Sequence, residues 1–330
     1  MSKFYTKDNI EAFILTYNRK DMLKDSIISI LNQSIGQVKI TVLDNCSSDG
    51  TEDMVKEMMQ QYSNLHYYRQ NQKMSDLENF RTISNLAQKD FTILFHDDDI
   101  MHPDYFSYAI EAINKYPNTT IVSSCYQDWS NPTNDNWAKA SQRFDYCMDK
   151  KTFVNYLYRM QRLAYSNTIY KTQNLKDHIY DMEYYAQFGR MFDKPFVANT
   201  MKDDDGAVIF RSKRLLRYRV YSEQENKETV PTYENIIAYN RFTKLYMQDC
   251  WYSKFMYNLI NYKQLRVAYF WGRDFTLSLS EFIQRAIDEN AGCEWTKLCI
   301  IPVVGKIFVE IAHILRKFFK TRYKRIFVLH

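Results

Sequence analysis

Three consecutive aspartates, Asp97, Asp98 and Asp99, follow an apolar run at residues 91–95 that is typical of a buried strand, with only His96 between. Carboxylates crowded together repel one another, and a hard divalent cation relieves that repulsion. The cluster therefore predicts a site for Mg²⁺ or Mn²⁺ together with a diphosphate. The same residues also fit a solvated turn, or the N-terminal cap of a helix that begins near Pro103, because acidic residues are common in both places.

Two further polar segments follow apolar runs, at residues 16–19 (Thr-Tyr-Asn-Arg) and 44–51 (Asp-Asn-Cys-Ser-Ser-Asp-Gly-Thr). The Asp44 carboxylate can accept hydrogen bonds from a nucleobase N–H or from ribose hydroxyls, and the Tyr17 ring offers a flat face on which a base can stack. Residues 44–51 are also ordinary turn residues, so a turn that leads into a helix explains them equally well.

The elements that must position these segments alternate strand-like and helix-like runs, which predicts a parallel sheet with crossover helices. Strands are expected at residues 12–16, 38–43, 65–68, 91–95 and 120–125. A capping box, Ser75 to Glu78, predicts the start of one of the helices between them. Ligands of such sheets bind beyond the carboxyl ends of the strands, so the three polar segments are expected to meet at one edge.

The rest of the chain has a different pattern. Residues 126–146 are rich in Asn, Asp and Trp and predict a loop, and from Lys150 onward the pattern is mostly helical and rich in tyrosine.

The blocks at residues 13–19, 42–51 and 91–104, with Asn79 between them, resemble in order and spacing the nucleotide-binding half of family 2 glycosyltransferases. The resemblance covers about residues 10–125. It implies an α/β protein of the GT-A fold, a mixed and mainly parallel sheet flanked by helices, with a helical C-terminal extension. Three regions are expected: a nucleotide-sugar-binding half at 1–125, an acceptor and catalytic-base half at 126–230, and a helical region at 231–330.

Carried over by motif position, the resemblance implies the roles of individual residues. The nucleotide is expected to contact Thr16, Tyr17, Asn18, Arg19, Asp44, Asn79, Asp97 and Asp98, with Asp44 on the uridine, Asp97 on ribose or metal, and Asn79 near the diphosphate. Asp99, with Asp97, is expected to bind the metal, Mn²⁺ or Mg²⁺. His96 stands where many relatives carry another Asp, a departure that we expect to be tolerated.

A catalytic base is expected in the second half, where the family has a short acidic motif before a helix. Asp181 is our first choice and Glu183 our second, because an inverting transfer needs a carboxylate within reach of the acceptor hydroxyl. Both could equally be ordinary acids near a helix start. Residues 216–221 resemble a stretch in which the family has a histidine that helps to bind metal or diphosphate, and here that position is Tyr221.

The departure at Tyr221 leaves Arg217 or Arg219 as the residues expected to hold the phosphates. The aromatic faces of Trp129 and Trp137 could stack on the sugar rings of an acceptor. Because aromatic side chains more often belong to the core, the same two residues also fit a purely structural role.

Composition excludes several other classes of protein. Only 7 of the 330 residues are glycine, and no two are spaced as a Rossmann or P-loop motif requires. The six cysteines form no CxxC pair, and no run of about 18 apolar residues is uninterrupted. These features, with an N-terminus that lacks the pattern of a signal peptide, predict a reduced, cytoplasmic protein without spanning helices.

The C-terminal segment at about 300–326 predicts an amphipathic helix with a basic end. Residues 295–330 hold eight Lys and Arg and one acid, whereas the whole chain has a net charge of +5. Such a helix is typical of a protein that lies on an anionic membrane surface. A helix docked on the catalytic domain, or on a second copy in a homo-oligomer, would show the same pattern. No nucleic-acid motif is present, so no nucleic acid is expected as a partner.

The expected activity is therefore metal-dependent, inverting transfer of a sugar from a nucleotide-sugar, UDP-linked in the first instance, to a hydroxyl of a glycan. A lipid-linked oligosaccharide of bacterial surface polysaccharide synthesis is the expected acceptor class, at the inner face of the membrane. Two alternatives stay open: a catalytically silent scaffold that binds nucleotide-sugar, and a sugar nucleotidyltransferase. The second would need a Gly-rich loop in place of residues 16–19.

Overall fold

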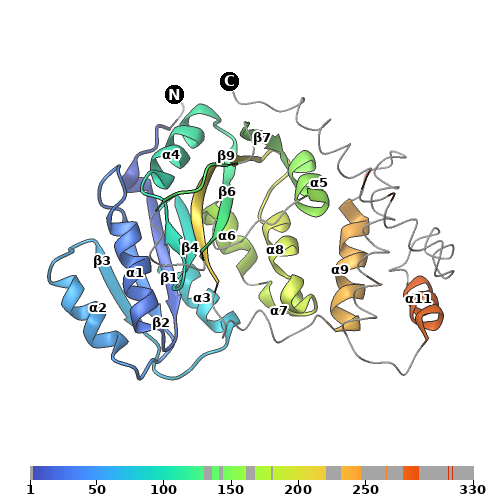
Figure 1. Ribbon diagram of the computed structural model, residues 1–330, viewed down its shortest axis with the longest axis horizontal. Coiled ribbons are helices and arrows are strands. Elements are labelled where there is room, and N and C mark those ends of the chain that lie inside the picture. The colour runs from blue at the N-terminus through green and yellow to red at the C-terminus, as the bar shows by residue number, and fades with distance from the viewer. Residues whose placement is uncertain are drawn as a thin grey trace.

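The structure is a computed structural model that describes residues 3–129, 136–140, 144–160, 168–179, 181–220, 232–246, 265, 278–289, 311 and 314. Its centre is one mixed sheet with the strand order β3-β2-β1-β4-β8-β6-β9-β5, and β7 pairs with β9 (Figure 1). Helices cover both faces, which confirms the expected α/β architecture.

The first half of the sheet is parallel, as expected. It consists of β1 (Ile10–Thr16), β2 (Lys39–Asp44), β3 (Leu65–Arg69) and β4 (Phe91–His96), which pair in parallel register. The connections are α1 (Lys20–Leu31), α2 (Thr51–Met59) and α3 (Asp76–Leu86), and the expected capping box of Ser75 and Glu78 does begin α3. Because the strands are parallel, their carboxyl ends share one edge.

The second half of the sheet corrects two expectations. The predicted loop at 126–146 is wrong at its start, because β6 (Thr119–Trp129) continues to Trp129, and β7 (Tyr146–Asp149) begins at its last residue. The mostly helical prediction after Lys150 is wrong for two segments, which form the strands β8 (Thr168–Lys171) and β9 (Gly206–Arg219). Basic and polar residues, Arg-Ser-Lys-Arg, stand in the middle of β9 and hide its apolar ends from a pattern search.

Those basic residues form an irregularity between β6 and β9. Ser124 pairs with Phe210, but the next residue, Cys125, pairs with Arg214, so three residues of β9 bulge out. The Asp145 carboxylate holds the bulge: it accepts the backbone N–H groups of Arg211 and Ser212 at 2.8 and 2.7 Å, and the Lys213 ammonium at 3.0 Å. A bulge bends its strand, and here it lies between the buried start of β9 and the site at its end.

Two apolar cores sandwich the sheet. Alternate residues of each strand face opposite sides, so Ala12 and Ile14 join one core and Phe13 the other. The first core lies under α1, α2 and α4 (Tyr105–Lys115). The second lies under α3, α5 (Lys150–Met160), α6 (Thr172–Ile179), α7 (Met182–Ala186), α8 (Asp193–Asn199) and α9 (Tyr233–Tyr246).

The C-terminal region is described only in part. Helix α9 forms the outer edge of the helical layer, and helix α11 (Leu279–Asp288) lies beyond it, away from the sheet (Figure 1). The two helices share a small apolar cluster around Ile236, Phe282 and Leu265. Of the expected basic tail at 300–326, only Ile311 and Ile314 belong to the described residues, and both are exposed. The rest of that prediction lies outside them. None of the described helices combines the length and apolarity that a membrane crossing requires.

Candidate active site

The three aspartates form the turn between β4 and the short strand β5 (Ile100–Met101), at the carboxyl edge of the sheet. All three are buried: Asp97 is 4%, Asp98 6% and Asp99 0% exposed. Buried carboxylates are costly unless they are paired or bind a cation. The exposed, solvated turn that the sequence left open is therefore not what forms here.

Two side chains at and just after the end of β1 donate hydrogen bonds to Asp97. The Thr16 hydroxyl donates to one carboxylate oxygen at 2.8 Å, and the Arg19 guanidinium donates to the other at 3.1 Å. Arg19 also lies 3.6 Å from the Asp98 carboxylate. Burial raises the pKa of Asp97 above its ordinary value, and the Arg19 charge opposes that rise. The two polar segments after β1 and β4 thus meet, as the sequence predicted.

Asp99 is the most enclosed of the three. Its Oδ1 accepts the backbone N–H of Arg219, at the end of β9, at 3.2 Å. Its Oδ2 is buried and accepts no hydrogen bond from any described residue. Burial, and then the neighbouring Asp98 charge, raise the pKa of Asp99 well above its ordinary value.

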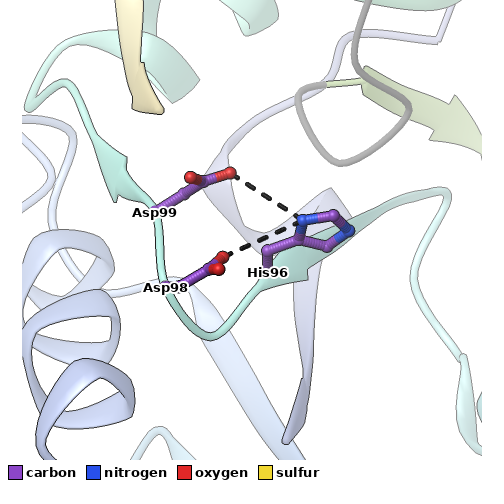
Figure 2. Close-up of side chains that lie close together, drawn as sticks. All are labelled: His96, Asp98 and Asp99. Carbon is purple, nitrogen blue, oxygen red and sulfur yellow. Dashed lines mark ion pairs between the residues drawn. The ribbon is translucent and has the colours of Figure 1, made fainter. Parts of the chain in front are cut away.

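A cation would fit this arrangement. One ligand atom from each of His96, Asp98 and Asp99 lies within 4.8 Å of the other two, and Figure 2 shows both carboxylates turned toward the imidazole ring. The buried Asp99 oxygen without a hydrogen-bond donor is what a carboxylate arranged for a metal would leave. The sequence paired Asp99 with Asp97 as ligands, whereas the structure brings Asp99 together with Asp98 and His96.

The end of β2 forms the neighbouring part of the site. Asp44 is fully buried; it accepts the backbone N–H of Ser47 at 2.9 Å, the Arg69 guanidinium at 3.0 Å and the Tyr67 hydroxyl. Each carboxylate oxygen can accept two hydrogen bonds, so one position on Oδ1 is not used by these three donors. Its expected contact with uridine stays a prediction.

Asn18 joins the loops after β1 and β2. Its backbone N–H donates to the Ser47 hydroxyl at 2.9 Å, and its side-chain oxygen accepts the Ser48 N–H at 2.8 Å. Asn18 and Cys46 both have positive φ, 51° and 69°, a conformation that asparagine tolerates better than most residues. Asn18 thus fixes the shape of this rim, and its predicted contact with the nucleotide is untested.

A cavity of about 640 Å³ opens beside the aspartates, between the ends of β1 and β4 and the start of α3. Its polar lining comprises Thr16, Tyr17, Arg19, Asn45, Lys73, Ser75, Asp76, His96 and Asp97. The Lys73 ammonium lies 4.3 Å above the centroid of the Tyr17 ring. Lys73 was not predicted from the sequence, although its position between β3 and α3, at the same edge of the sheet, was a usable signal.

Asn79, on α3, is fully buried and is not among the residues that line this cavity. Its side-chain oxygen accepts the Gln70 amide at 3.1 Å, and its Nδ2 donates to no described residue. The expected role near the diphosphate is untested.

The two candidate bases lie at the start of α7 and are exposed. Asp181 is the N-cap residue that precedes the helix, and it lies 3.5 Å from His178 Nδ1. Glu183 accepts the Arg81 guanidinium at 2.9 Å, and Arg81 belongs to α3. This ion pair places α7 next to the helix whose first turn lines the cavity. Which of the two acids acts as base stays a prediction.

The end of β9 stacks arginine on tryptophan. The Arg217 guanidinium lies 4.3 Å from the Trp137 ring centroid and 5.6 Å from that of Trp129, and Arg219 lies 4.6 Å from Trp129. Arg219 also donates to the Asp98 carbonyl at 2.8 Å and to Asp25 at 3.0 Å. Trp129 is buried, 8% exposed, as the purely structural role predicts. Tyr221 lies outside the described residues.

Comparison with known proteins gives matches at two levels. The profile of the family described as Glycosyl transferase family 2 matches residues 12–182. Over 98 residues the chain is 35% identical to the abequosyltransferase RfbV of Salmonella typhimurium, a stretch that covers 29% of each protein. Over 107 residues it is 27% identical to a Campylobacter jejuni GalNAc(5)-diNAcBac-PP-undecaprenol beta-1,3-glucosyltransferase, covering 32% of this chain and 35% of that one. The matched stretches thus span about a third of these relatives.

Two solved structures share the fold over most of the chain. Staphylococcus aureus TarS 1-349 in complex with UDP-GlcNAc superposes with a TM-score of 0.63 at 13% identity, covering 93% of this chain and 89% of the other. The mannosyltransferase PcManGT of Pyrobaculum calidifontis, in complex with GDP-Man and Mn²⁺, gives 0.52 at 11% identity, covering 97% and 88%. At these identities the likeness concerns the fold alone.

Proposed function

The chain belongs to glycosyl transferase family 2 and has the GT-A fold, and from this premise we propose that it transfers a sugar from a nucleotide-sugar to a hydroxyl of a glycan. The observation that carries the proposal is the group of buried aspartates at the carboxyl edge of the sheet, beside a cavity of about 640 Å³. That volume is within the range of small-molecule sites.

The donor is proposed to bind between the ends of β1, β2 and β4. Tyr17, which is 39% exposed, provides a face for the base, and Asp44 has an acceptor position for a base or ribose. Arg19, at the rim, offers positive charge toward a diphosphate. The solved neighbours were captured with UDP-GlcNAc and with GDP-Man, so the fold accepts either nucleotide; we propose UDP because the sequence blocks resemble uridine-binding ones.

A divalent cation, Mn²⁺ or Mg²⁺, is proposed to bind at Asp99, with Asp97 or Asp98 beside it. When bound, such an ion offsets the negative charge of the diphosphate leaving group. Other residues of the chain hold these aspartates in position, since Thr16 and Arg19 orient Asp97 and the Arg219 backbone orients Asp99. Arg217 and Arg219 are proposed to supply further positive charge.

The acceptor is proposed to approach from the side of α7, where Asp181, or else Glu183, takes the proton of the attacking hydroxyl. Attack from the face opposite the leaving group inverts the anomeric carbon, as the family resemblance implies. Trp137, partly exposed near the end of β9, is a candidate contact for a sugar ring, and the buried Trp129 lies near the same Arg217 guanidinium.

Assembly of a bacterial surface polysaccharide on a lipid carrier is the proposed setting. The names of two relatives, an abequosyltransferase and a glucosyltransferase acting on an undecaprenol-linked glycan, support it. The chain is proposed to work in the cytoplasm at the inner face of the membrane, held there by the basic segment at 300–326, alone or as a homo-oligomer.

The proposal can be tested by thermal-shift and donor-hydrolysis screening of the full chain against UDP-, GDP-, CMP- and dTDP-sugars, with and without Mn²⁺. One nucleotide-sugar should stabilise the protein in a metal-dependent manner, and Asp99→Ala should abolish both that stabilisation and hydrolysis. Asp53→Ala, on the exposed face of α2, is the matched control and should change neither. Stabilisation by a donor without any turnover would favour the silent scaffold, and stabilisation by none would refute the proposal.

A further inference from the structure

The imidazole of His96 faces two of the three aspartates. Its Nδ1 lies 3.9 Å from Asp99 Oδ2 and 4.0 Å from Asp98 Oδ1, and the dashed lines in Figure 2 mark these two contacts. Both distances exceed those of a hydrogen bond, which needs about 2.7 to 3.2 Å. The imidazole and the two carboxylates therefore face a common space, and the imidazole Nδ1 is too far from either carboxylate for a hydrogen bond.

That space has the dimensions of a coordination site. A small divalent ion binds nitrogen or oxygen at about 2.0 to 2.2 Å, so two ligand atoms are about 3.0 Å apart at neighbouring octahedral positions and about 4.2 Å apart at opposite ones. The observed separations of 3.9 and 4.0 Å fall between these limits. A small rotation of the partly exposed imidazole would bring it to either position.

A second observation points to a ligand in the same space. Asp99 is 0% exposed, yet its Oδ2 accepts no hydrogen bond from the described residues and is directed at the imidazole. The guanidinium of Arg19 is engaged with Asp97 and Asp98. A carboxylate that is ionised and buried in this way is stabilised when a cation binds to it.

His96 also stands at the entrance. Its side chain is 37% exposed and lines the cavity, whereas the side chains of Asp98 and Asp99 are 8% and 0% exposed. An ion entering from the cavity would contact the imidazole on one side and the carboxylates on the other. Its remaining positions would face the cavity, where water or diphosphate oxygens can occupy them.

We propose that His96 is a nitrogen ligand of the cation at this site, and that the site therefore prefers a transition-metal dication such as Mn²⁺ over Mg²⁺. The inference rests on the proposed function only in assuming that a cation binds there. Mg²⁺ is a hard ion that takes oxygen ligands. Imidazole nitrogen suits Fe²⁺, Ni²⁺, Cu²⁺ and Zn²⁺ best; Mn²⁺ favours oxygen ligands too, but as the first member of the same first-row series it accepts nitrogen more readily than Mg²⁺ does. Exchanging one oxygen ligand for nitrogen thus weakens the binding of Mg²⁺ relative to the binding of transition metals.

The decisive experiment is direct binding of Mn²⁺ to the metal-free full chain, measured by electron paramagnetic resonance with and without inorganic pyrophosphate. Pulsed spectra should show modulation from a coordinated ¹⁴N nucleus, and Mg²⁺ should compete poorly. His96→Ala should remove the nitrogen modulation and lower the affinity for Mn²⁺ by about tenfold or more, and it should lower the affinity for Mg²⁺ less. His66→Ala, an exposed histidine on β3, is the control and should change nothing.

The outcomes separate the two proposals. Bound Mn²⁺ without nitrogen modulation, or equal Mn²⁺ affinity in wild type and His96→Ala, would overturn the role of His96. If Asp99→Asn still abolished binding in that case, the aspartate site would stand. Absence of Mn²⁺ binding by the wild type, with or without pyrophosphate, would overturn both. His96→Gln, which keeps a polar side chain of similar length, checks that lost binding does not reflect misfolding.

Discussion

Replacing Asp99 by asparagine should stabilise the metal-free protein while it removes the proposed cation site. The substituted side chain keeps an oxygen for the Arg219 backbone N–H and places an NH₂ group where Oδ2 now has no hydrogen-bond donor. The new amide faces the carboxylate of Asp98 and His96 Nδ1, all within 4.8 Å. A buried charge is thus exchanged for a neutral donor near two acceptors.

The size of the effect follows from the burial. Leaving a buried polar group unsatisfied costs about 1 to 3 kcal/mol, so Asp99→Asn should raise the free energy of unfolding by about that amount. Burial and the Asp98 charge raise the pKa of Asp99 well above 3.8, so the folded chain holds this proton more tightly than the unfolded one. The protonated Asp99 carboxyl therefore contributes to the stability of the wild type below about pH 3.8, and this contribution is lost as the pH rises through the raised pKa.

The assay is thermal unfolding of wild type, Asp99→Asn and the control Asp53→Asn in excess chelator, from pH 4 to pH 9. The variant should melt several degrees above the wild type at pH 8, and this difference should shrink toward pH 4. Added Mn²⁺ should reverse the order by stabilising the wild type alone. An Asp99→Asn protein that melts at or below the wild-type temperature at pH 8 in chelator would refute the electrostatic reasoning.

Three further predictions concern the surroundings of the site. Asp181→Asn should lower kcat at least a hundredfold with little change in donor affinity, whereas Glu183→Gln should lower it less; steady-state kinetics with a matched acceptor would reveal the reverse order if the choice of base is wrong. Tyr17→Ala should weaken nucleotide binding, measured by calorimetry, by about tenfold through lost stacking, and an unchanged Kd would place the base elsewhere. Asp145→Ala should lower stability by about 3 kcal/mol in urea unfolding, since two backbone N–H groups lose a charged acceptor, while Asp128→Ala, exposed on β6, should cost little.

The sequence predicted the part of the site that depends on local chain order. The apolar runs that became β1, β2 and β4 each end in polar residues, and parallel pairing alone brings Thr16 beside Asp97. Nothing comparable indicated β9. Its middle is basic, its bulge depends on Asp145, and its contact with Asp99 is set by pairing with β5 and β6 rather than by sequence neighbours.

His96 shows a different limit. Its residue type was visible, but whether a histidine beside three aspartates faces them or turns away depends on the bend of the turn after β4. From the sequence we could expect only that this substitution is tolerated, whereas the structure places the ring against two carboxylates.

The closure of Asp99 by β9 has a consequence for the order in which the chain folds. The donor of its hydrogen bond, Arg219, lies 120 residues further along the chain. During synthesis the parallel strands β1 to β4 emerge first, and contacts between distant segments form last. A nascent chain that ends before β9 lacks the strand that seals Asp99 from water. The proposed cation site would therefore be complete only once the polypeptide has been synthesised through β9, and a shorter product would lack it.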